Sequence, residues 1–117
     1  MEQITVDELK KRVDAGEKLN IIDVREPDEY AEFNIGGKLV PLGNILSMQV
    51  DELEDYKDEE LIVHCRSGKR SAQACLFLET MGYSNCMNVE GVVLAWQEKF
   101  GNIKAYERRP IRRTRDA

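Results

Sequence analysis

The sequence lacks long hydrophobic runs and lacks the features of an export signal. No apolar stretch approaches the roughly 18 residues that are needed to cross a bilayer. The first residues, Met1 to Thr5, contain no basic segment followed by an apolar one, as a secretory leader would. We therefore expect a cytoplasmic protein that has no membrane partner.

Cysteine and histidine are also scarce, and their spacing is unsuited to metal binding. The chain has three cysteines and one histidine, and Cys65, Cys75 and Cys86 form no Cys-x-x-Cys pair. Together with His64 they make a poor zinc set, because the spacings do not match those of zinc knuckles. The odd number of cysteines favours free thiols in a reducing compartment. We expect neither a metal nor a cofactor.

The charge of the chain is unevenly distributed. The net charge is −5, but residues 104–117 hold six basic and two acidic side chains, which is +4 and leaves −9 on the rest. We therefore expect one domain over residues 1–103, followed by a basic tail over residues 104–117. The tail could contact an acidic partner, fold back on the acidic body or stay solvated. Nucleic-acid binding is disfavoured, because no aromatic residues are interleaved with the arginines.

Strand-like and helix-like stretches alternate along the chain. The first half is expected to contain a helix over 6–15, a strand over 19–25, a short helix from Pro27, an extended piece over 38–42 and a weak helix over 43–57. The weak helix is expected to turn Ile45, Met48, Leu53 and Tyr56 inward. The second half is expected to contain a strand over 61–64, a helix over 71–81, a strand over 86–89 and a helix over 92–100. This alternation predicts an α/β domain with a mainly parallel sheet and helices on both faces.

The loop between residues 65 and 70 is the most informative segment of the chain. An apolar strand ends at Cys65, and a helix is expected to begin five or six residues later, with one glycine and three cations between them. Such a loop can turn successive backbone N–H groups inward and form an anion-binding concavity. Those dipoles, together with Arg66, Lys69 and Arg70, would stabilise a thiolate at the lip of the concavity. The sequence thus predicts a nucleophilic cysteine in an anion cradle.

Three segments that follow expected strands resemble those of single-domain rhodaneses, a family of sulfurtransferases. They are Ile22-Asp23-Val24-Arg25-Glu26-Pro27-Asp28-Glu29-Tyr30, Val63-His64-Cys65-Arg66-Ser67-Gly68-Lys69-Arg70-Ser71, and Asn88-Val89-Glu90-Gly91 with Leu94-Ala95-Trp96. They occur in family order and spacing over residues 4–100. Because ligands collect at the carboxyl ends of parallel strands, the segments should meet at one edge of the sheet.

The resemblance implies a small rhodanese-like α/β fold and a cysteine that carries sulfane sulfur as a persulfide. By position, Cys65 matches the sulfur carrier, and the active-site loop is matched by Arg66, Ser67, Gly68, Lys69 and Arg70. The expected reaction moves sulfur from thiosulfate or a persulfide to a thiol or to cyanide, with a sulfur-relay protein as a further candidate partner. The expected chemistry needs no general base, because the cradle itself lowers the pKa of the cysteine.

Two segments depart from the family pattern. The chain has Phe33-Asn34-Ile35-Gly36-Gly37 where the family commonly has a Gly-His-Ile-Pro-Gly-like turn, and it has Val92 after Gly91 where a second glycine is common. In the family both segments line or support the rim of the pocket. The resemblance therefore implies an altered access route for the sulfur acceptor.

Two other functions fit parts of the sequence. His64-Cys65 and Arg70-Ser71 nearly form the phosphatase signature, but four residues rather than five separate the cysteine from the arginine. A shorter loop should make a tighter ring of amides, which favours a sulfur atom over a tetrahedral phosphate. A non-enzymatic docking module is the other alternative, because fold similarity does not establish activity. The basic tail would then be the docking arm.

Other polar and aromatic residues have more ordinary interpretations. Strand alternation places His64 on the face opposite Cys65, so we expect a hydrogen-bonded structural histidine rather than a catalytic base. Asp23 and Arg25 are expected to pair or to brace the active loop. The remaining expectations place three side chains in the core: Cys75, Cys86 and Trp96.

Overall fold

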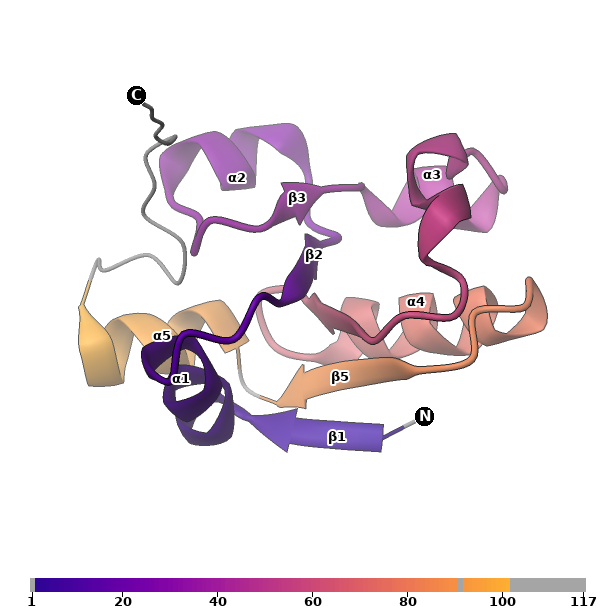
Figure 1. Ribbon diagram of the computed structural model, residues 1–117. Coiled ribbons are helices and arrows are strands. Elements are labelled where there is room, and N and C mark those ends of the chain that lie inside the picture. The colour runs from indigo at the N-terminus through magenta and orange to yellow at the C-terminus, as the bar shows by residue number, and fades with distance from the viewer. Residues whose placement is uncertain (1, 91, 102–117) are drawn as a thin grey trace, which may run out of the picture.

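The structure, a computed structural model, describes residues 2–90 and 92–101, without the side chains of residues 92–94. Five parallel strands form one sheet in the order β1-β5-β4-β2-β3 (Figure 1). The strands are β1 (Glu2–Thr5), β2 (Asn20–Asp23), β3 (Lys38–Leu39), β4 (Leu61–His64) and β5 (Cys86–Glu90). The expected α/β class with a parallel sheet is confirmed. The basic tail over residues 104–117 lies outside the described residues, so its role stays a prediction.

Helices cover both faces of the sheet, as expected. They are α1 (Val6–Asp14), α2 (Pro27–Glu32), α3 (Leu42–Leu46), α4 (Lys69–Thr80) and α5 (Val92–Phe100), together with the 3-10 helix η1 (Asp51–Tyr56). Figure 1 shows α1 beside α5. No helix among the described residues is long and apolar enough to cross a membrane.

Two hydrophobic clusters lie on opposite faces because neighbouring strand residues point in opposite directions. Leu61 and Val63 of β4 pack with α3, η1 and α4, whereas Ile62 between them packs with α1 and α5. The second cluster contains Trp96, which is 1% exposed, so its expected core position is confirmed. The central strand is therefore buried on both sides, which holds its carboxyl end and the loop after it in a fixed place.

Capping signals were read correctly at the start of α1 and α2. The Glu8 N–H donates to the Thr5 hydroxyl (3.1 Å), and the Thr5 N–H donates to the Glu8 carboxylate (2.9 Å). Pro27 occupies the first turn of α2, as expected. The strand β1 over residues 2–5 was missed, because its polar, exposed residues carry little strand signal.

The stretch over residues 43–57 is where the expectation was partly wrong. α3 ends at Leu46, Met48 takes a positive φ of 62°, and a 3-10 helix follows from Asp51. Ile45 and Leu53 are buried as expected, but this break turns Met48 outward, where it is 64% exposed, and Tyr56 is 36% exposed. Helical periodicity across the break had placed both side chains in the core.

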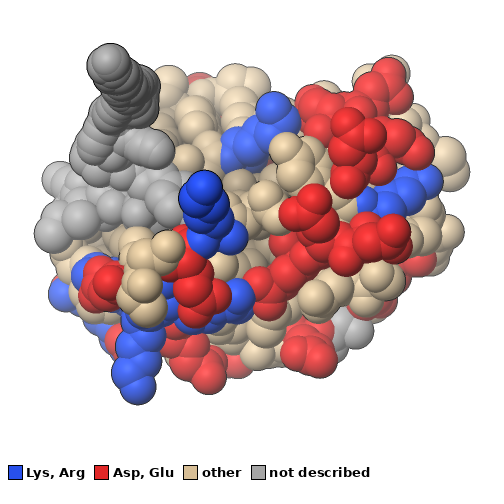
Figure 2. Space-filling model, viewed as in Figure 1, with Lys and Arg blue, Asp and Glu red and all other residues tan. Residues whose placement is uncertain are grey.

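Acidic side chains gather on the surface around η1. Residues 51–60 hold seven acids and a single lysine: Asp51, Glu52, Glu54, Asp55, Asp58, Glu59, Glu60 and Lys57. Figure 2 shows red side chains concentrated on the right-hand part of the face viewed there. The excess negative charge expected for the body of the chain is therefore locally concentrated.

Candidate functional site

The loop after β4 turns back on itself so that polar hydrogens converge on one sulfur atom. The Gly68 N–H lies 3.1 Å from Cys65 Sγ, and the Ser71 N–H and hydroxyl each lie 3.4 Å from it. Ser71 belongs to the first turn of α4, so its N–H is one that the helix leaves without a partner. The inward-turned N–H groups expected from the sequence are therefore present, and their role in binding an anion stays a prediction.

A glycine makes this turn possible. Gly68 is the N-cap of α4 and has a φ of 98°, a conformation that costs an L-residue about 1 kcal/mol or more. With this turn in place, α4 begins at Lys69 rather than at the expected Ser71. The earlier start brings the Ser71 N–H and hydroxyl over the sulfur.

The position of Cys65 differs from the expected one in an important respect. We expected the cysteine at the lip of the cradle, but it is 0% exposed and packs within the cluster on the α4 face. Arg66 and Ser67, the next two residues of the loop, are exposed. The sulfur therefore does not lie at the surface.

Burial and hydrogen bonding act in opposite directions on this thiol. Burial raises the pKa of Cys65, because a desolvated thiolate is unfavourable. The Ser71 hydroxyl and the N–H groups of Ser71, Gly68 and Ser67 outweigh burial and hold the pKa below its ordinary value. The site therefore favours a thiolate through direct donors.

The three cations of the loop are not equivalent. Arg70 donates two hydrogen bonds to Glu29 of α2, at 2.8 and 3.0 Å, and lowers the pKa of that carboxyl to about 2. Arg66 and Lys69 are exposed, and they form no ion pair within the described part of the chain. Arg70 therefore joins the loop to α2, whereas Arg66 and Lys69 stay at the surface.

The expected pairing of Asp23 and Arg25 is confirmed at the carboxyl end of β2. The Arg25 side chain donates to both Asp23 oxygens (2.8 to 3.2 Å) and also to the Phe33 carbonyl (2.6 Å). Asp23 is 0% exposed, and it lies opposite His64 in the register of β2 and β4. The pair therefore braces the segment after α2 and does not face the surface.

Asn34 organises the turn that departs from the family pattern. Its Nδ2 donates to the Tyr30 carbonyl (3.0 Å), and its Oδ1 accepts from the Gly36 N–H (2.9 Å). A Cβ on Gly37 would lie 2.7 Å from the Ile21 carbonyl oxygen, so the turn packs directly on β2. The other departure, Val92, has a side chain outside the described residues.

His64 is buried on the side of the sheet away from Cys65, as expected, but it is not satisfied. It alternates with Val63 and Cys65, which belong to the α4 face. Neither ring nitrogen has a hydrogen-bond partner among the described residues, and Nε2 lies 3.8 Å from Asp23 Oδ2. Burial lowers the pKa of His64, which favours the neutral ring. The expectation of a hydrogen-bonded histidine was therefore wrong.

Two residues that matter at the site were not singled out from the sequence. Ser71 was read only as the start of a helix, and Asn88 only as part of a family segment. The Ser71 hydroxyl also donates to Asn88 Oδ1, and both residues are almost completely buried. An asparagine in the middle of a strand that is otherwise largely apolar was a signal that could have marked this position, because a polar group that becomes buried there needs a partner.

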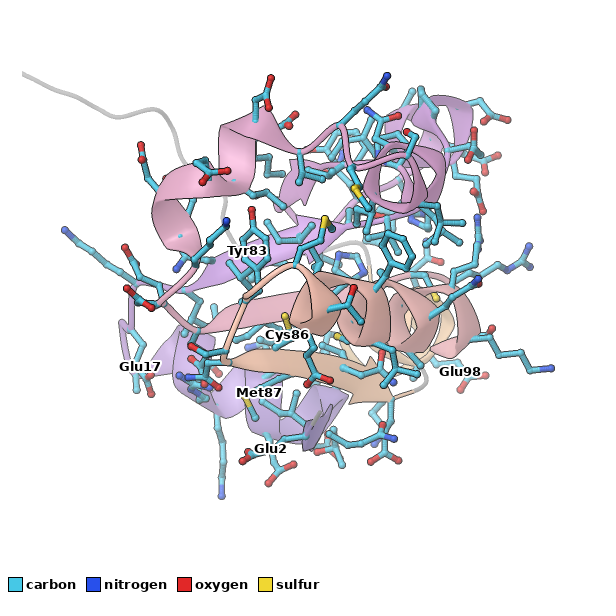
Figure 3. The ribbon with its side chains drawn as sticks, turned by 90° about the vertical axis from the view of Figure 1, so that its right-hand side faces the viewer. Glu2, Glu17, Tyr83, Cys86, Met87 and Glu98 are labelled. Carbon is cyan, nitrogen blue, oxygen red and sulfur yellow. The ribbon has the colours of Figure 1, made fainter. Side chains whose placement is uncertain are left out.

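The described residues contain no group of three or more His, Cys, Asp or Glu side chains that could hold a metal ion. Cys75 and Cys86 are buried between α4 and β5, as expected for core thiols, and Figure 3 shows Cys86 on β5 beneath the helix.

Comparison with known proteins places this geometry in one family. The sequence model of the Rhodanese-like domain matches residues 5–99, and the chain belongs to this family. It is 37% identical over 98 residues to a putative sulfurtransferase of Bacillus subtilis, covering 83% of this chain and 91% of that one. It is 32% identical over 94 residues to a sulfurtransferase of Allochromatium vinosum, covering 80% and 86%.

Solved structures agree with this assignment. A rhodanese-like domain protein of Staphylococcus aureus superposes with a TM-score of 0.73 at 35% identity. The match covers 89% of this chain and 99% of that one. The rhodanese-like fold and the family implied by the sequence are both confirmed.

Proposed function

We propose that the protein is a sulfurtransferase in which Cys65 carries sulfane sulfur as a persulfide. Its family and the relatives named sulfurtransferases support the general activity. The observation that carries the finer proposal is the convergence of two N–H groups and one hydroxyl on the Cys65 sulfur. Donors at that point stabilise negative charge on sulfur before and after transfer.

The first half-reaction is a displacement at sulfur. The Cys65 thiolate attacks the outer sulfur of thiosulfate and forms a new S–S bond. The S–S bond of the donor breaks, and sulfite leaves with its electron pair. No oxidant is needed, because the donor supplies sulfur that is already at the sulfane level.

The second half-reaction regenerates the thiolate. A thiolate or cyanide attacks the outer sulfur of the persulfide, and the Cys65 sulfur leaves with the electron pair of the S–S bond. The N–H groups of Gly68 and Ser71 then receive that charge at the distances already described. A leaving group of lowered pKa departs faster, so the same donors serve both halves of the cycle.

The loop residues have separate parts in this proposal. Gly68 permits the turn, the Ser67 and Gly68 amides hold the sulfur, and Arg66 and Lys69 attract an anionic donor to the exposed side of the loop. Arg70 fixes the loop through Glu29. Its positive charge also attracts the thiolate, because Arg70 and Cys65 interact electrostatically.

A protein partner is a further part of the proposal. The chain is 34% identical over 98 residues to a putative sulfur carrier protein of Bacillus subtilis, of which it covers 51%. A sulfur-relay partner in the cytoplasm would replace thiosulfate as donor or accept the sulfur from Cys65. Small-molecule thiols remain the simplest acceptors.

The proposal is tested by measuring thiocyanate formed from thiosulfate and cyanide, with the native chain and with Cys65→Ser. Intact-mass analysis after thiosulfate treatment should show one added sulfur atom that peptide mapping places on Cys65. Equal thiocyanate formation by both chains would refute the role of Cys65. Turnover of an aryl phosphate ester would instead favour the phosphatase alternative, and partner binding without any sulfur adduct would favour the docking module.

A further inference from the structure

A chain of polar contacts runs from the buried Cys65 sulfur to the surface of the protein. The Ser71 hydroxyl lies 3.4 Å from Cys65 Sγ and within hydrogen-bond distance of Asn88 Oδ1. Asn88 Nδ2 donates to Gln3 Oε1 at 3.1 Å. Ser71 is 0% and Asn88 3% exposed, whereas Gln3 on the edge strand β1 is exposed.

The backbone holds this chain of contacts in register. Gln3 and Asn88 lie directly opposite each other on the paired strands β1 and β5, so their side chains share one face of the sheet. Cys86, two residues before Asn88, points to the same face and belongs to the cluster under α4. The network therefore joins the edge of the sheet to the first turn of α4.

The position of the Ser71 hydroxyl proton determines the direction of the hydrogen bonds in this network. The Ser71 hydroxyl has one hydrogen but two acceptors, the Cys65 sulfur and Asn88 Oδ1. When Cys65 is a thiol, its S–H can donate to Ser71 Oγ while the hydroxyl donates to Asn88. When Cys65 is a thiolate, the Ser71 hydroxyl donates its proton to the sulfur. Asn88 Oδ1 and Ser71 Oγ would then face each other with no proton between the two oxygens.

Two amides can resolve this conflict by turning over. A rotation of 180° exchanges the oxygen and nitrogen of the Asn88 amide in nearly the same positions, so that Nδ2 donates to Ser71 Oγ. Gln3 must turn with it, offering Nε2 to Asn88 Oδ1. Because Gln3 is exposed, water can satisfy its free amide atom in either orientation.

We propose that Asn88 and Gln3 are positioning residues, whose amide orientation decides whether the Ser71 proton points at the Cys65 sulfur or away from it. The direction of the hydrogen bonds at the edge of the sheet is thereby linked to the charge on the sulfur. The inference rests on the proposed function only in naming Cys65 as the sulfur carrier. The effect of the amide orientation itself is measured by alkylation of the Cys65 thiol.

Other charged groups surround the network and must be separated from it. The charged or titratable side chains on the elements packed around Cys65 and Gln3 include Glu2, Glu8, Lys11, Arg12, Asp23, Arg25, Glu29, His64, Arg66, Lys69, Arg70, Cys75, Glu79, Cys86 and Glu90. Asp23 pairs with Arg25, Glu29 with Arg70, and Arg12 with Glu60. The two main variants of the test therefore change Gln3 alone and leave all of these groups in place.

The test is the pH dependence of alkylation of Cys65 by iodoacetamide, followed peptide by peptide in Gln3→Glu and Gln3→Lys. The carboxylate of Gln3→Glu only accepts, so Asn88 must donate to it and the Ser71 proton turns away from the sulfur. The ammonium of Gln3→Lys only donates, so the Ser71 proton is released to the sulfur. We expect the midpoint of alkylation to rise in the first variant and to fall in the second, each changing the thiolate fraction near neutral pH about threefold or more.

A matched control removes the direct effect of charge. Glu2→Gln also raises the net charge by one, by removing a negative charge from the neighbouring residue, whose side chain points to the other face of β1 and to solvent (Figure 3). In 1 M salt the Debye length is roughly 3 Å, so the influence of an exposed charge is screened while hydrogen-bond direction is not. The shifts of the Gln3 variants should persist in 1 M salt, and Glu2→Gln should leave the midpoint unchanged there.

Either of two results would overturn the inference. One is a Gln3→Lys midpoint that equals that of Glu2→Gln in 1 M salt. The other is an Asn88→Asp variant, folded by circular dichroism, whose alkylation midpoint does not rise, because that carboxylate can only accept from Ser71. Thiocyanate formation is measured in parallel, so a failure of the sulfur-carrier proposal shows in Cys65→Ser and a failure of this inference shows in the midpoints.

Discussion

Two regions of the protein hold equally buried cysteines in opposite chemical environments. Cys65 and Cys75 are each 0% exposed, and Cys86 is 3% exposed. The hydrogen bond between Cys75 and Cys86, together with burial, raises the pKa of Cys75, whereas the same hydrogen bond lowers the pKa of Cys86. Burial also raises the pKa of Cys65, but the Ser71 hydroxyl and the loop N–H groups outweigh it.

The difference indicates that burial alone does not set the pKa of a thiol. Cys75 lies in the middle of α4, where backbone N–H groups are already used by the helix. Cys65 lies before the first turn of the same helix, where N–H groups have no helical partner. The same helix therefore offers no free donor to Cys75 and supplies donors that lower the pKa of Cys65.

The largest effect on the comparison between the two thiols is expected when the sulfur of Cys65 itself is removed. Cys65→Ser should lower sulfur transfer to cyanide by about a thousandfold or more, because the nucleophile is lost. Cys75→Ala is the matched control, and it should keep the rate within about twofold of the native chain. A Cys75 variant as inactive as Cys65→Ser would contradict the assignment of roles to the two thiols.

The next largest effect is expected when one hydrogen-bond donor to Cys65 is removed and the thiol is kept. Ser71→Ala takes away the hydroxyl but keeps the N–H, so the sulfur-transfer rate at neutral pH should fall about tenfold. The optimum of the rate should also move to higher pH, because the pKa of Cys65 rises when a donor to the thiolate is lost. A pH–rate profile of the half-reaction with thiosulfate measures both, and an unchanged profile would mean that the hydroxyl serves only Asn88.

A smaller effect tests the turn that places the donors. Gly68→Ala should destabilise the fold by about 1 kcal/mol or more, since its φ of 98° is unfavourable for a residue with a Cβ. Urea unfolding gives that free energy, and Gly43→Ala is the control, because an added Cβ there meets nothing within 4 Å. Equal loss of stability in the two variants would mean that the turn is not strained by a side chain.

Because the pKa of Cys65 is lowered in the folded protein, the free energy of unfolding should depend on pH, and the lowering sets the direction of that dependence. The folded pKa is lowered, so between the folded and unfolded values the unfolded chain binds more protons, and stability rises with pH. The contribution is fully present above the unfolded pKa of about 8.5 and is lost as the pH falls through the folded value. Urea unfolding of the native chain minus that of Cys65→Ala isolates this slope, and a difference that falls with rising pH would contradict the lowered pKa.

The smallest effect concerns the ion pair that joins the loop to α2. Glu29→Gln should cost about 0.5 to 1 kcal/mol, because the side chains of Arg70 and Glu29 are only 34% and 27% exposed and the pair is bidentate. Urea unfolding checks this value. Lys10→Gln, which breaks the more exposed pair with Asp14, should cost less.

The reactive loop could be read from the sequence because its signals are local. A buried strand ending at Cys65, the glycine at position 68 and the following helix are adjacent in the chain, and each has a direct physical consequence. The alternation of strands and helices fixed the parallel class in the same way. Family segments then placed the loop within a known fold.

Features that depend on strand order could not be predicted. Asn88 meets Ser71 and Gln3 only because β5 lies between β4 and the edge strand β1, and β1 itself has an exposed polar sequence.

The depth of Cys65 was also missed, since it depends on how α3 and α4 pack over the end of β4. Met48 was misplaced because one residue with positive φ interrupts the helical pattern.

The most direct test of the central claim compares the two thiols in one sample. Iodoacetamide is added to the native protein across a pH series, and alkylation of Cys65 and Cys75 is quantified on their separate peptides. If the N–H groups and the Ser71 hydroxyl stabilise a thiolate, Cys65 reacts with a midpoint below the roughly 8.5 of a free cysteine, and Cys75 stays unmodified until the protein unfolds. A Cys65 midpoint at or above that of a free cysteine would contradict the claim.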